Sequence, residues 1–370
     1  MLHYFLTGAT GAIGSAFLMR IASRQAPITL LLRATTREEA NARLQKLLNF
    51  LNLDPNSTRH IEALPGDLQL PSLGMQPNDY DRVAKTCTHL VHCAGNVYMN
   101  LPLEQARQQT LTMTSGILAL LQSSSRACKL ELVSTVGVGG HTQGEIPEAW
   151  IDHPRAFHNS YEAAKAEAEQ LVREKIQAGL PITVHRPSMV VGDSQTGRTI
   201  AFQVFYYLCE FLSGARTQGW LPQVGKMRLD IVPADYVAEI LDWSSQKGNH
   251  TRQILHSCSG AQGAIPLRIL IERIREIFRA HGRRLPATKL IPLPLFQLLL
   301  GAARPLIAPR HRRALDALPF FFAYLKEDQT FANSQTLRLL EADGIHLPKV
   351  EEYLENILHY YLTAAGKPKL

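Results

Sequence analysis

The chain has 370 residues, of which 45% are hydrophobic and 19% are charged. This composition supports a large buried core and excludes a disordered or collagen-like chain. The formal net charge of +7 suits phosphate-bearing ligands and acidic partners. Because no basic helix is interleaved with aromatic residues and no zinc-finger spacing occurs, nucleic-acid binding is not expected.

The five cysteines are scattered, with no C-x-x-C pair. Their spacing predicts neither a disulfide framework nor a metal site, and a reducing compartment fits better. The first residues lack the basic and apolar regions of a secretory signal. No uninterrupted apolar stretch reaches the ~18 residues of a membrane span. We therefore expect a cytoplasmic protein, with a membrane association left open by the apolar and basic segment 291–313.

The first half of the chain alternates strand-like and helix-like segments. Short apolar runs predict strands at 3–7, 28–33, 60–64, 88–94, 130–135 and 181–187. Longer segments between them predict helices at 11–24, 36–51, 101–123 and 158–178. Continuous apolar strands that alternate with helices indicate an α/β fold, a Rossmann-like doubly wound parallel sheet covered on both faces.

Three glycines lie between the first predicted strand and the first predicted helix, in TGATGAIG. Gly8 allows a tight turn, Gly11 a close approach of a pyrophosphate to the backbone, and Gly14 close packing of helix on sheet. The hydroxyl of Thr10 can donate to a phosphate oxygen at the start of this helix. The spacing is G-x-x-G-x-x-G rather than the G-x-G-x-x-G of many dinucleotide-binding proteins. A turn that needs glycines only for its shape is the alternative.

The second predicted strand ends at Arg33, where NAD-binding proteins usually place a carboxylate that accepts from the ribose 2′-hydroxyl. A guanidinium pairs with a 2′-phosphate, which a carboxylate would repel. The sequence therefore favours NADP over NAD, unless Arg33 is only a solvated surface residue. Arg37 either assists it or is exposed on the next helix.

Tyr161 and Lys165 are four residues apart in a predicted helix and therefore share one face. A phenol titrates at about pH 10, and an adjacent ammonium lowers its pKa, which makes Tyr161 a candidate proton donor. Ser134 and Thr135 end the fifth predicted strand, where ligands bind in open parallel sheets. We expect Thr135 rather than Ser134 to orient a substrate carbonyl. A Ser-Thr turn with local hydrogen bonds is the alternative.

These motifs, with PGDL, HCAGNV, HRPSMVVGD and VPADYVA in the same order over about residues 3–240, resemble the extended short-chain dehydrogenase/reductase superfamily. Within it the chain looks most like the fatty acyl-CoA reductase (male sterility) and thioester-reductase group. The patterns that carry this finer resemblance are Arg33 in LLR, HRPSMVVGDSQTG and a late motif over 331–361. After about residue 187 helical patterns broken by proline dominate. We therefore expect an NADP-binding domain over 1–240, with 187–228 contributing to the substrate side, and a smaller, mostly helical substrate-binding domain over 241–370.

The resemblance implies roles for single residues. The pyrophosphate turn matches Gly8, Thr10, Gly11, Ala12, Ile13 and Gly14, and the reader of the 2′-phosphate matches Arg33. Asp67 and Leu68 match the adenine pocket of the family, and Ala94 and Gly95 match the turn beside the adenine ribose. Pro187, Ser188 and Met189 match the loop beside the nicotinamide. The catalytic hydroxyl, acid and lysine match Thr135, Tyr161 and Lys165. One departure is Met113 or Thr112 near the place of a frequent Asn, which puts a water relay through that Asn in doubt.

The reaction that the resemblance implies is NADPH-dependent reduction of an acyl thioester, carried on coenzyme A or an acyl carrier protein, to an aldehyde. Whether an alcohol follows is left open. The alternatives are an extended-family enzyme that acts on a nucleotide sugar or a steroid-like alcohol, and a non-catalytic NADP-sensing module. The segment 291–313 fits an acyl-chain site or a membrane contact, or else a core helix followed by a solvated run of charges. No metal is expected, because the histidines show no metal-ligand spacing.

Overall fold

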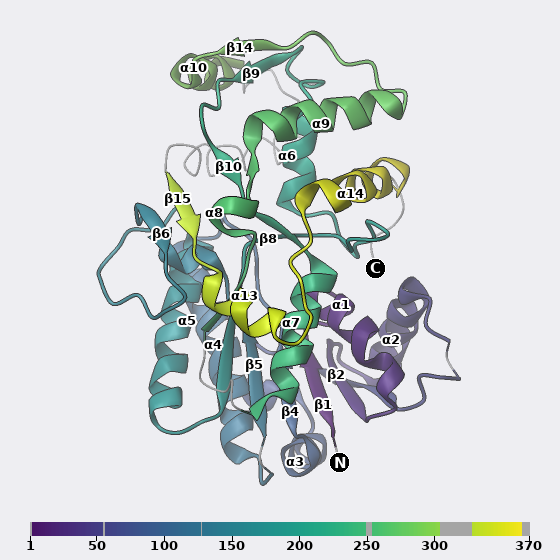
Figure 1. Cartoon of the computed structure of the whole chain (residues 1–370). Coiled ribbons are helices and arrows are strands. Elements are labelled where there is room, and N and C mark those ends of the chain that lie inside the picture. The colour runs from purple at the N-terminus through teal and green to yellow at the C-terminus, as the bar shows by residue number, and fades with distance from the viewer. Residues whose placement is uncertain (1, 55, 127, 249–253, 304–327, 365–370) are drawn as a thin grey trace.

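The computed structural model describes residues 2–54, 56–126, 128–248, 254–303 and 328–364. Within them, the largest sheet has seven strands in the order β12-β7-β5-β4-β1-β2-β3 (Figure 1). All neighbouring strands in it are parallel. The strands are β1 (Tyr4–Thr7), β2 (Ile28–Arg33), β3 (Ile61–Gly66), β4 (His89–His92), β5 (Lys129–Val133), β7 (Ile182–Pro187) and β12 (Ile254–Ser257). The predicted Rossmann-like α/β fold is therefore confirmed.

Helices cover both faces of this sheet, because alternate residues of a strand point to opposite sides. Tyr4 and Leu6 of β1 pack in one core with residues of three helices, and Phe5 packs in a second core with residues of three others. The first core includes α1 (Ala12–Ile21), α2 (Arg37–Leu51) and α7 (Ala234–Gln246). The second includes α3 (Pro77–Thr86), α4 (Leu103–Ser123) and α5 (Ser160–Gln177).

Helices α3 and α7 and strand β12 of this layered unit were not predicted. Helix α3 is mostly polar, and only Val83 and Ala84 in it are buried, so its apolar stripe is too narrow to stand out in the sequence. Strand β12 is a run of four residues, too short to assign by pattern. It pairs with β7 at one edge of the sheet, so residues beyond 240 complete the sheet. The expected domain division at residue 240 stays a prediction.

The later part of the chain adds short strand pairs and helices above the carboxyl edge of the sheet in the view of Figure 1. The pairs are β8 (Met189–Val191) with β11 (Ile231–Pro233), β9 (Trp220–Pro222) with β14 (Lys289–Ile291), β10 (Arg228–Leu229) with β13 (Ile265–Pro266), and β6 (Gly144–Ile146) with β15 (Gln329–Phe331). A third apolar core joins α6 (Val204–Leu212), α9 (Leu267–Ala280), α10 (Leu293–Ala303) and α14 (Val350–Ala364). The remaining helices of the described residues are α8 (Gly260–Gly263) and α13 (Ser334–Glu341).

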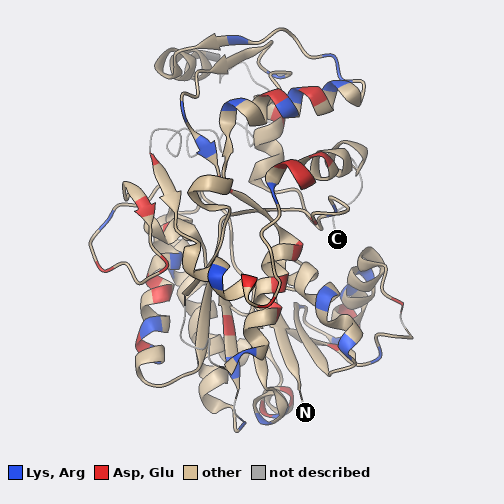
Figure 2. Cartoon of the chain, in the orientation of Figure 1, with Lys and Arg blue, Asp and Glu red and all other residues tan. Residues whose placement is uncertain are grey.

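Charges of both signs are spread over the helices. Figure 2 shows Lys and Arg interspersed with Asp and Glu along the helices in view. Of the helices that the structure describes, none has both the length and the apolar character needed to cross a bilayer.

Candidate active site at the carboxyl edge of the sheet

The glycine-rich loop after β1 packs directly against the loop after β4. Gly8 has φ +76°, which favours glycine, and a Cβ there would lie 2.5 Å from the backbone nitrogen of Ala94. A Cβ on Gly14 would lie 2.2 Å from the carbonyl oxygen of Gly8. Gly11 is less crowded, since its Cβ would lie 3.3 Å from the same oxygen. Gly8 and Gly14 therefore serve the packing of the loop, while the space beside Gly11 is open to a ligand.

The start of α1 suits a phosphate group. Gly11 precedes the helix and makes no side-chain cap, and the N–H of Ser15 is the first to bond back to its carbonyl, at 2.9 Å. By helix geometry the N–H groups of Ala12, Ile13 and Gly14 have no partner within the helix. Together with the helix dipole, such N–H groups attract anions. The turn lies between β2 and β4, where the strand order reverses and open α/β sheets bind their ligands.

Arg33 is the last residue of β2, and its side chain is 78% exposed. Its Nε lies 4.0 Å from the carboxylate of Asp67, the first residue after β3. Arg37, by contrast, is held in a 2.6 Å ion pair with Asp79 of α3. The guanidinium of Arg33 is therefore accessible to a 2′-phosphate, whereas that of Arg37 already has a partner.

The residues expected around adenosine lie along the same edge. The Oδ1 of Asp67 accepts a hydrogen bond from the N–H of Gln69 at 2.9 Å, which fixes the loop that carries the half-buried Leu68. Gly95 follows β4, and a Cβ there would lie 3.5 Å from the Nζ of Lys165. The adenosine side and the side of the predicted catalytic residues thus meet at Gly95.

The three predicted catalytic residues converge at the end of β5. The hydroxyl of Thr135 lies close enough to the phenol of Tyr161 to lower its pKa. The Oγ1 of Thr135 also accepts from the N–H of Gly137 at 3.1 Å, which leaves its own proton for donation. The Nζ of Lys165 donates to the carbonyl oxygen of Val133, the last residue of β5, at 3.0 Å. One hydroxyl, one phenol and one ammonium therefore gather beside the glycine-rich loop.

The choice between the two adjacent hydroxyls follows from their direction. The hydroxyl of Ser134 is buried without a hydrogen-bond partner in the structure, and its N–H donates to the carbonyl of His185 at 2.7 Å. Successive side chains of an extended segment point to opposite sides. Thr135 therefore faces Tyr161, and Ser134 faces the interior.

The N-terminal cap of helix α5 fixes the position of Tyr161 and Lys165. The side chain of Asn159 accepts from the N–H of Glu162 at 3.0 Å, and such a cap fixes the first helical turn. Tyr161 lies in that turn, and Lys165 lies one turn further on the same face.

Burial dominates the electrostatics of the site. It raises the pKa of Tyr161 to about 12, helped by the nearby carboxylate of Glu162 and opposed by the hydroxyl of Thr135. It lowers the pKa of Lys165 to about 8, opposed by Glu169 and Cys93. The expected lowering of the pKa of Tyr161 by Lys165 is thus not observed in the ligand-free chain. Tyr161 is an uncharged phenol at neutral pH, which is the form that donates a proton.

The loop expected beside the nicotinamide connects β7 and β8 and contains Pro187, Ser188 and Met189. The N–H of Ser188 donates to the carbonyl of Ser257 at 3.1 Å, and its hydroxyl lies beside the carboxylate of Asp230. Burial raises the pKa of Asp230 to about 6, although it accepts two backbone N–H bonds at 2.8 Å. The sequence analysis did not single out Asp230. The sequence feature that could have pointed to Asp230 is a single carboxylate directly before the apolar residues of β11.

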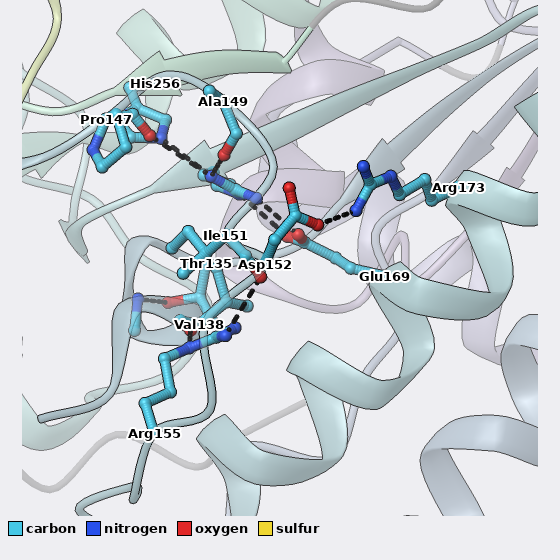
Figure 3. Close-up of polar contacts among 12 residues, drawn as sticks. Thr135, Val138, Pro147, Ala149, Ile151, Asp152, Arg155, Glu169, Arg173 and His256 are labelled. Carbon is cyan, nitrogen blue, oxygen red and sulfur yellow. Dashed lines mark hydrogen bonds and ion pairs between the residues drawn. The ribbon is translucent and has the colours of Figure 1, made fainter. Parts of the chain in front are cut away.

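A buried arginine network was also not predicted. Arg186 of β7 bonds both carboxylate oxygens of Glu169, and its Nη1 lies within hydrogen-bond distance of Ala149, Pro147 and His256. Figure 3 labels these four partners. The signal for Glu169 is its position four residues after Lys165, which continues the spacing that starts at Tyr161.

Two buried histidines, His92 and His3, have hydrogen-bond partners within the sheet rather than at the site. Burial lowers the pKa of His92 to about 3, and its Nδ1 shares a 2.8 Å hydrogen bond with Thr7. The Nε2 of His3 shares one of 2.9 Å with Thr29. Over the described part of the chain, no group of three or more His, Cys, Asp or Glu residues is placed to hold a metal ion.

Helix α10 covers the apolar half of segment 291–313. Phe296 is buried and packs edge-on against Phe211 of α6, with ring centroids 5.6 Å apart. Leu300 packs partly on the same core. The exposed leucines of this helix are Leu295, Leu298 and Leu299. The basic residues Arg310, Arg312 and Arg313 lie outside the described residues, so the acyl-chain site and the membrane contact at this segment stay predictions.

Comparison with known proteins places this arrangement in a family. The family model described as "Male sterility protein", an NAD-binding family, matches residues 6–241. The chain is 30% identical over 197 residues to an isonitrile lipopeptide synthase of Streptomyces coeruleorubidus, covering 52% of this chain and 13% of that protein. It is 30% identical over 249 residues to the glycine betaine reductase ATRR of Emericella nidulans, covering 64% of this chain and 19% of that protein. The chain thus spans less than a fifth of the length of these relatives.

Solved structures agree with the family match. The terminal R domain from the myxalamid PKS-NRPS biosynthetic pathway superposes with a TM-score of 0.81 at 26% identity, covering 99% of this chain and 91% of that one. A thiolation-reductase di-domain from an archaeal non-ribosomal peptide synthetase superposes with a TM-score of 0.76 over 98% of this chain and 75% of that one. At 17% identity the second likeness speaks for the fold alone.

The family match confirms the predicted resemblance, and it confirms the predicted cofactor class as NAD(P)(H). The glycine turn, the helix start and the exposed Arg33 fit such a dinucleotide. Together these findings show that the chain is an oxidoreductase of the male sterility family, in the thioester-reductase group of the extended short-chain dehydrogenase/reductase superfamily.

Proposed function

We propose that this chain uses NADPH to reduce an acyl thioester on a carrier protein and releases an aldehyde. The observation that carries the proposal is the convergence of Thr135, Tyr161 and Lys165 at the end of β5, beside the glycine-rich loop. The carrier is supported by the relatives, which include a lipopeptide synthase and reductase domains of peptide synthetases. One solved relative carries a thiolation domain next to its reductase domain.

Arg33 supports the choice of NADPH over NADH. Its exposed guanidinium stands at the end of β2, where a 2′-phosphate on the adenosine ribose lies in proteins of this fold. The nearby carboxylate of Asp67 is 4.0 Å away, too far to neutralise it fully. A guanidinium in this position gains a charge-assisted pair with a 2′-phosphate.

Bound NADPH supplies a hydride to the thioester carbonyl carbon. Tyr161 and Thr135 donate hydrogen bonds to the carbonyl oxygen, where negative charge develops during reduction. Tyr161 gives its proton to that oxygen, because burial keeps the phenol protonated at neutral pH. The resulting hemithioacetal loses its C–S bond, so the carbonyl re-forms as an aldehyde and the sulfur leaves as a thiol after protonation.

Lys165 has two parts in this scheme. As a cation it stabilises the phenolate that Tyr161 becomes on giving up its proton. Its Nζ lies close to Gly95 and bonds the carbonyl of Val133, so it can exchange that carbonyl for a ribose hydroxyl of the cofactor. Both parts require the protonated amine.

Coenzyme A as the carrier is the outcome that the assay below separates from a carrier protein. A fatty acyl chain, a role in lipid metabolism and a second reduction to an alcohol stay predictions. A nucleotide sugar substrate has no observation in its favour beyond the shared fold. A non-catalytic NADP sensor would have no need to keep Thr135, Tyr161 and Lys165 together.

The test compares NADPH oxidation on one acyl group presented as a carrier-protein thioester and as a coenzyme A thioester. We expect faster turnover on the carrier-protein thioester, with aldehyde detected as its oxime by mass spectrometry. Tyr161→Phe should abolish turnover. Tyr80→Phe is the matched control, because its hydroxyl contacts Ser123 at 3.3 Å, where α3 meets the end of α4. Equal NADPH oxidation by the parent and Tyr161→Phe on every thioester would remove the proposal.

A further inference from the structure

The buried face of α5 carries a third polar residue beyond the predicted pair. Tyr161, Lys165 and Glu169 follow one another at intervals of four residues and so form one row on the helix. Lys165 and Glu169 are both buried. A carboxylate one turn from a buried ammonium, on the same face, is placed to act on its charge.

Arg186 holds this carboxylate in place. Its Nε bonds one oxygen of Glu169 at 3.0 Å, and its Nη2 bonds the other at 2.6 Å. The guanidinium is only 1% exposed, so this bidentate pair is shielded from water. Both oxygens of Glu169 are therefore fixed, and the carboxylate cannot turn away from the row.

The same arginine ties α5 to the segment that runs from the end of β5 to α5. Its Nη1 donates to the carbonyl of Ala149 at 2.9 Å and lies 3.4 Å from the Nε2 of His256 (Figure 3). Burial and the guanidinium lower the pKa of His256 to about 3, so it is neutral. Its Nδ1 lies 2.7 Å from the carbonyl of Ala332, which makes Nδ1 the donor and leaves Nε2 as the acceptor for Arg186. The catalytic helix, the loop before it and β12 thus share one anchor.

The groups that face Lys165 differ in charge. Two of them are His92, the last residue of β4, and Cys93, the residue after it. Burial lowers the pKa of His92 to about 3 and raises that of Cys93 to about 12, so both are neutral near pH 7. Tyr161, on the same helix, is also neutral. Glu169 is the carboxylate that acts on Lys165, and it opposes the effect of burial on the pKa of the lysine.

We infer that Glu169, fixed by Arg186, is a positioning residue whose charge, one turn along the same buried face, keeps Lys165 protonated at the reacting end of α5. This inference rests on the proposed function, because the cation matters there for stabilising Tyr161 and holding the ribose. Glu169 contacts neither the expected substrate position nor the expected cofactor position. Its effect passes through Lys165.

The test is Glu169→Gln, which keeps the shape of the side chain and removes its charge. Glu167→Gln is the matched control on the same helix, since Glu167 pairs with Arg107 at 2.7 Å on a partly exposed face. We expect the alkaline limb of the pH–rate profile to move to lower pH by about one pH unit in Glu169→Gln, as expected for loss of a nearby opposite charge. The limb of Glu167→Gln should coincide with that of the parent.

A second readout does not depend on turnover. Lysines are reductively methylated with ¹³C-formaldehyde, and the Lys165 signal is assigned by its loss in Lys165→Arg. Its NMR titration midpoint should fall in Glu169→Gln and stay unchanged in Glu167→Gln. If the parent fails to reduce any thioester, this titration still decides the inference, so the two failures are distinguishable.

Two further variants guard against misfolding. Glu169→Gln with Arg186→Met removes both buried charges and leaves neither unpaired. It should shift the limb in the same direction as Glu169→Gln but by less, because the Arg186 cation, whose like charge also disfavours protonated Lys165, is gone. Glu169→Asp keeps the charge and should restore the limb of the parent, even where the rate is lower. A Lys165 titration at the parent's midpoint in folded Glu169→Gln, or in the double variant, would overturn the inference.

Discussion

The glycine-rich loop offers a prediction in which folding and cofactor binding separate. In Gly14→Ala the new Cβ would lie 2.2 Å from the carbonyl oxygen of Gly8. An ordinary contact of this kind is about 3.5 Å, so the start of α1 must retreat by roughly 1 Å from the loop. Overpacking of this size costs about 1–3 kcal/mol in the free energy of unfolding. The displacement also moves the helix N–H groups away from the pyrophosphate.

Gly11→Ala is the contrasting change in the same loop. Its backbone, at φ −97° and ψ 170°, suits any residue, and the nearest atom to the new Cβ is 3.3 Å away. This contact is tight but relieved by a shift of a few tenths of an ångström, so we expect a Tm close to that of the parent. The methyl group occupies the space into which we place the pyrophosphate, so the Kd for NADPH should rise about tenfold or more, which is ~1.4 kcal/mol or above.

The assays are calorimetry for Tm and fluorescence titration for the Kd of NADPH. Gly301→Ala in α10 is the control, since a Cβ there meets no atom within 4 Å and helix propensity favours alanine by up to about 1 kcal/mol. It should bind NADPH as the parent does. The reasoning fails if Gly11→Ala binds NADPH normally, or if Gly14→Ala keeps both the Tm and the affinity of the parent.

Further predictions concern the cofactor, the hydroxyl and the pH profile. Arg33→Ser should weaken NADPH binding at least tenfold, about 1.4 kcal/mol, and leave NADH binding unchanged, whereas Arg37→Ser, which loses only the pair with Asp79, should alter neither Kd. Equal losses for both cofactors would contradict a contact with the 2′-phosphate. Thr135→Val should lower kcat about a hundredfold with an unchanged Kd for NADPH, and Thr135→Ser should recover most of it. A fully active valine variant would show that the hydroxyl is dispensable. Because burial lowers the pKa of Lys165 to about 8, its cation exists below that pH, so NADPH oxidation should fall as pH rises through about 8. Lys165→Arg should lack this limb, and a rate that instead climbs through pH 8 would speak against a role for the cation.

Most features of the predicted cofactor-binding part of the chain could be predicted from local sequence patterns. The apolar strands, the glycines at the end of β1 and the i, i+4 spacing of Tyr161 and Lys165 are each encoded within a few residues, so the sequence alone predicts them. The preference for Thr135 over Ser134 had no such local pattern behind it, and it stays a prediction. The predicted division into two domains at residue 240 is harder to assess, because β12, which lies after residue 240, pairs with β7 in the main sheet.

What the sequence could not show depends on contacts between distant segments. The pairing of β8 with β11 joins short runs that carry no pattern of their own. The ion pair of Arg186 with Glu169 and the place of Asp230 beside Ser188 arise only after the strands are ordered. The pKa of Tyr161 depends on burial, which is a sum over the whole fold, and burial raises it, whereas the sequence emphasised a lowering by the nearby ammonium.

The central claim is that a phenol, an amine and an alcohol at the end of β5 promote the transfer of a hydride from NADPH, and of a proton from the phenol, to a thioester carbonyl. The most direct measurement uses NADPH deuterated at C4 of the nicotinamide, on both faces, and a carrier-protein thioester, with the product analysed by mass spectrometry. One deuterium at the aldehyde carbon and one free carrier thiol per NADPH oxidised is the predicted result. Aldehyde without deuterium, or NADPH consumed with the thioester intact, would contradict the account.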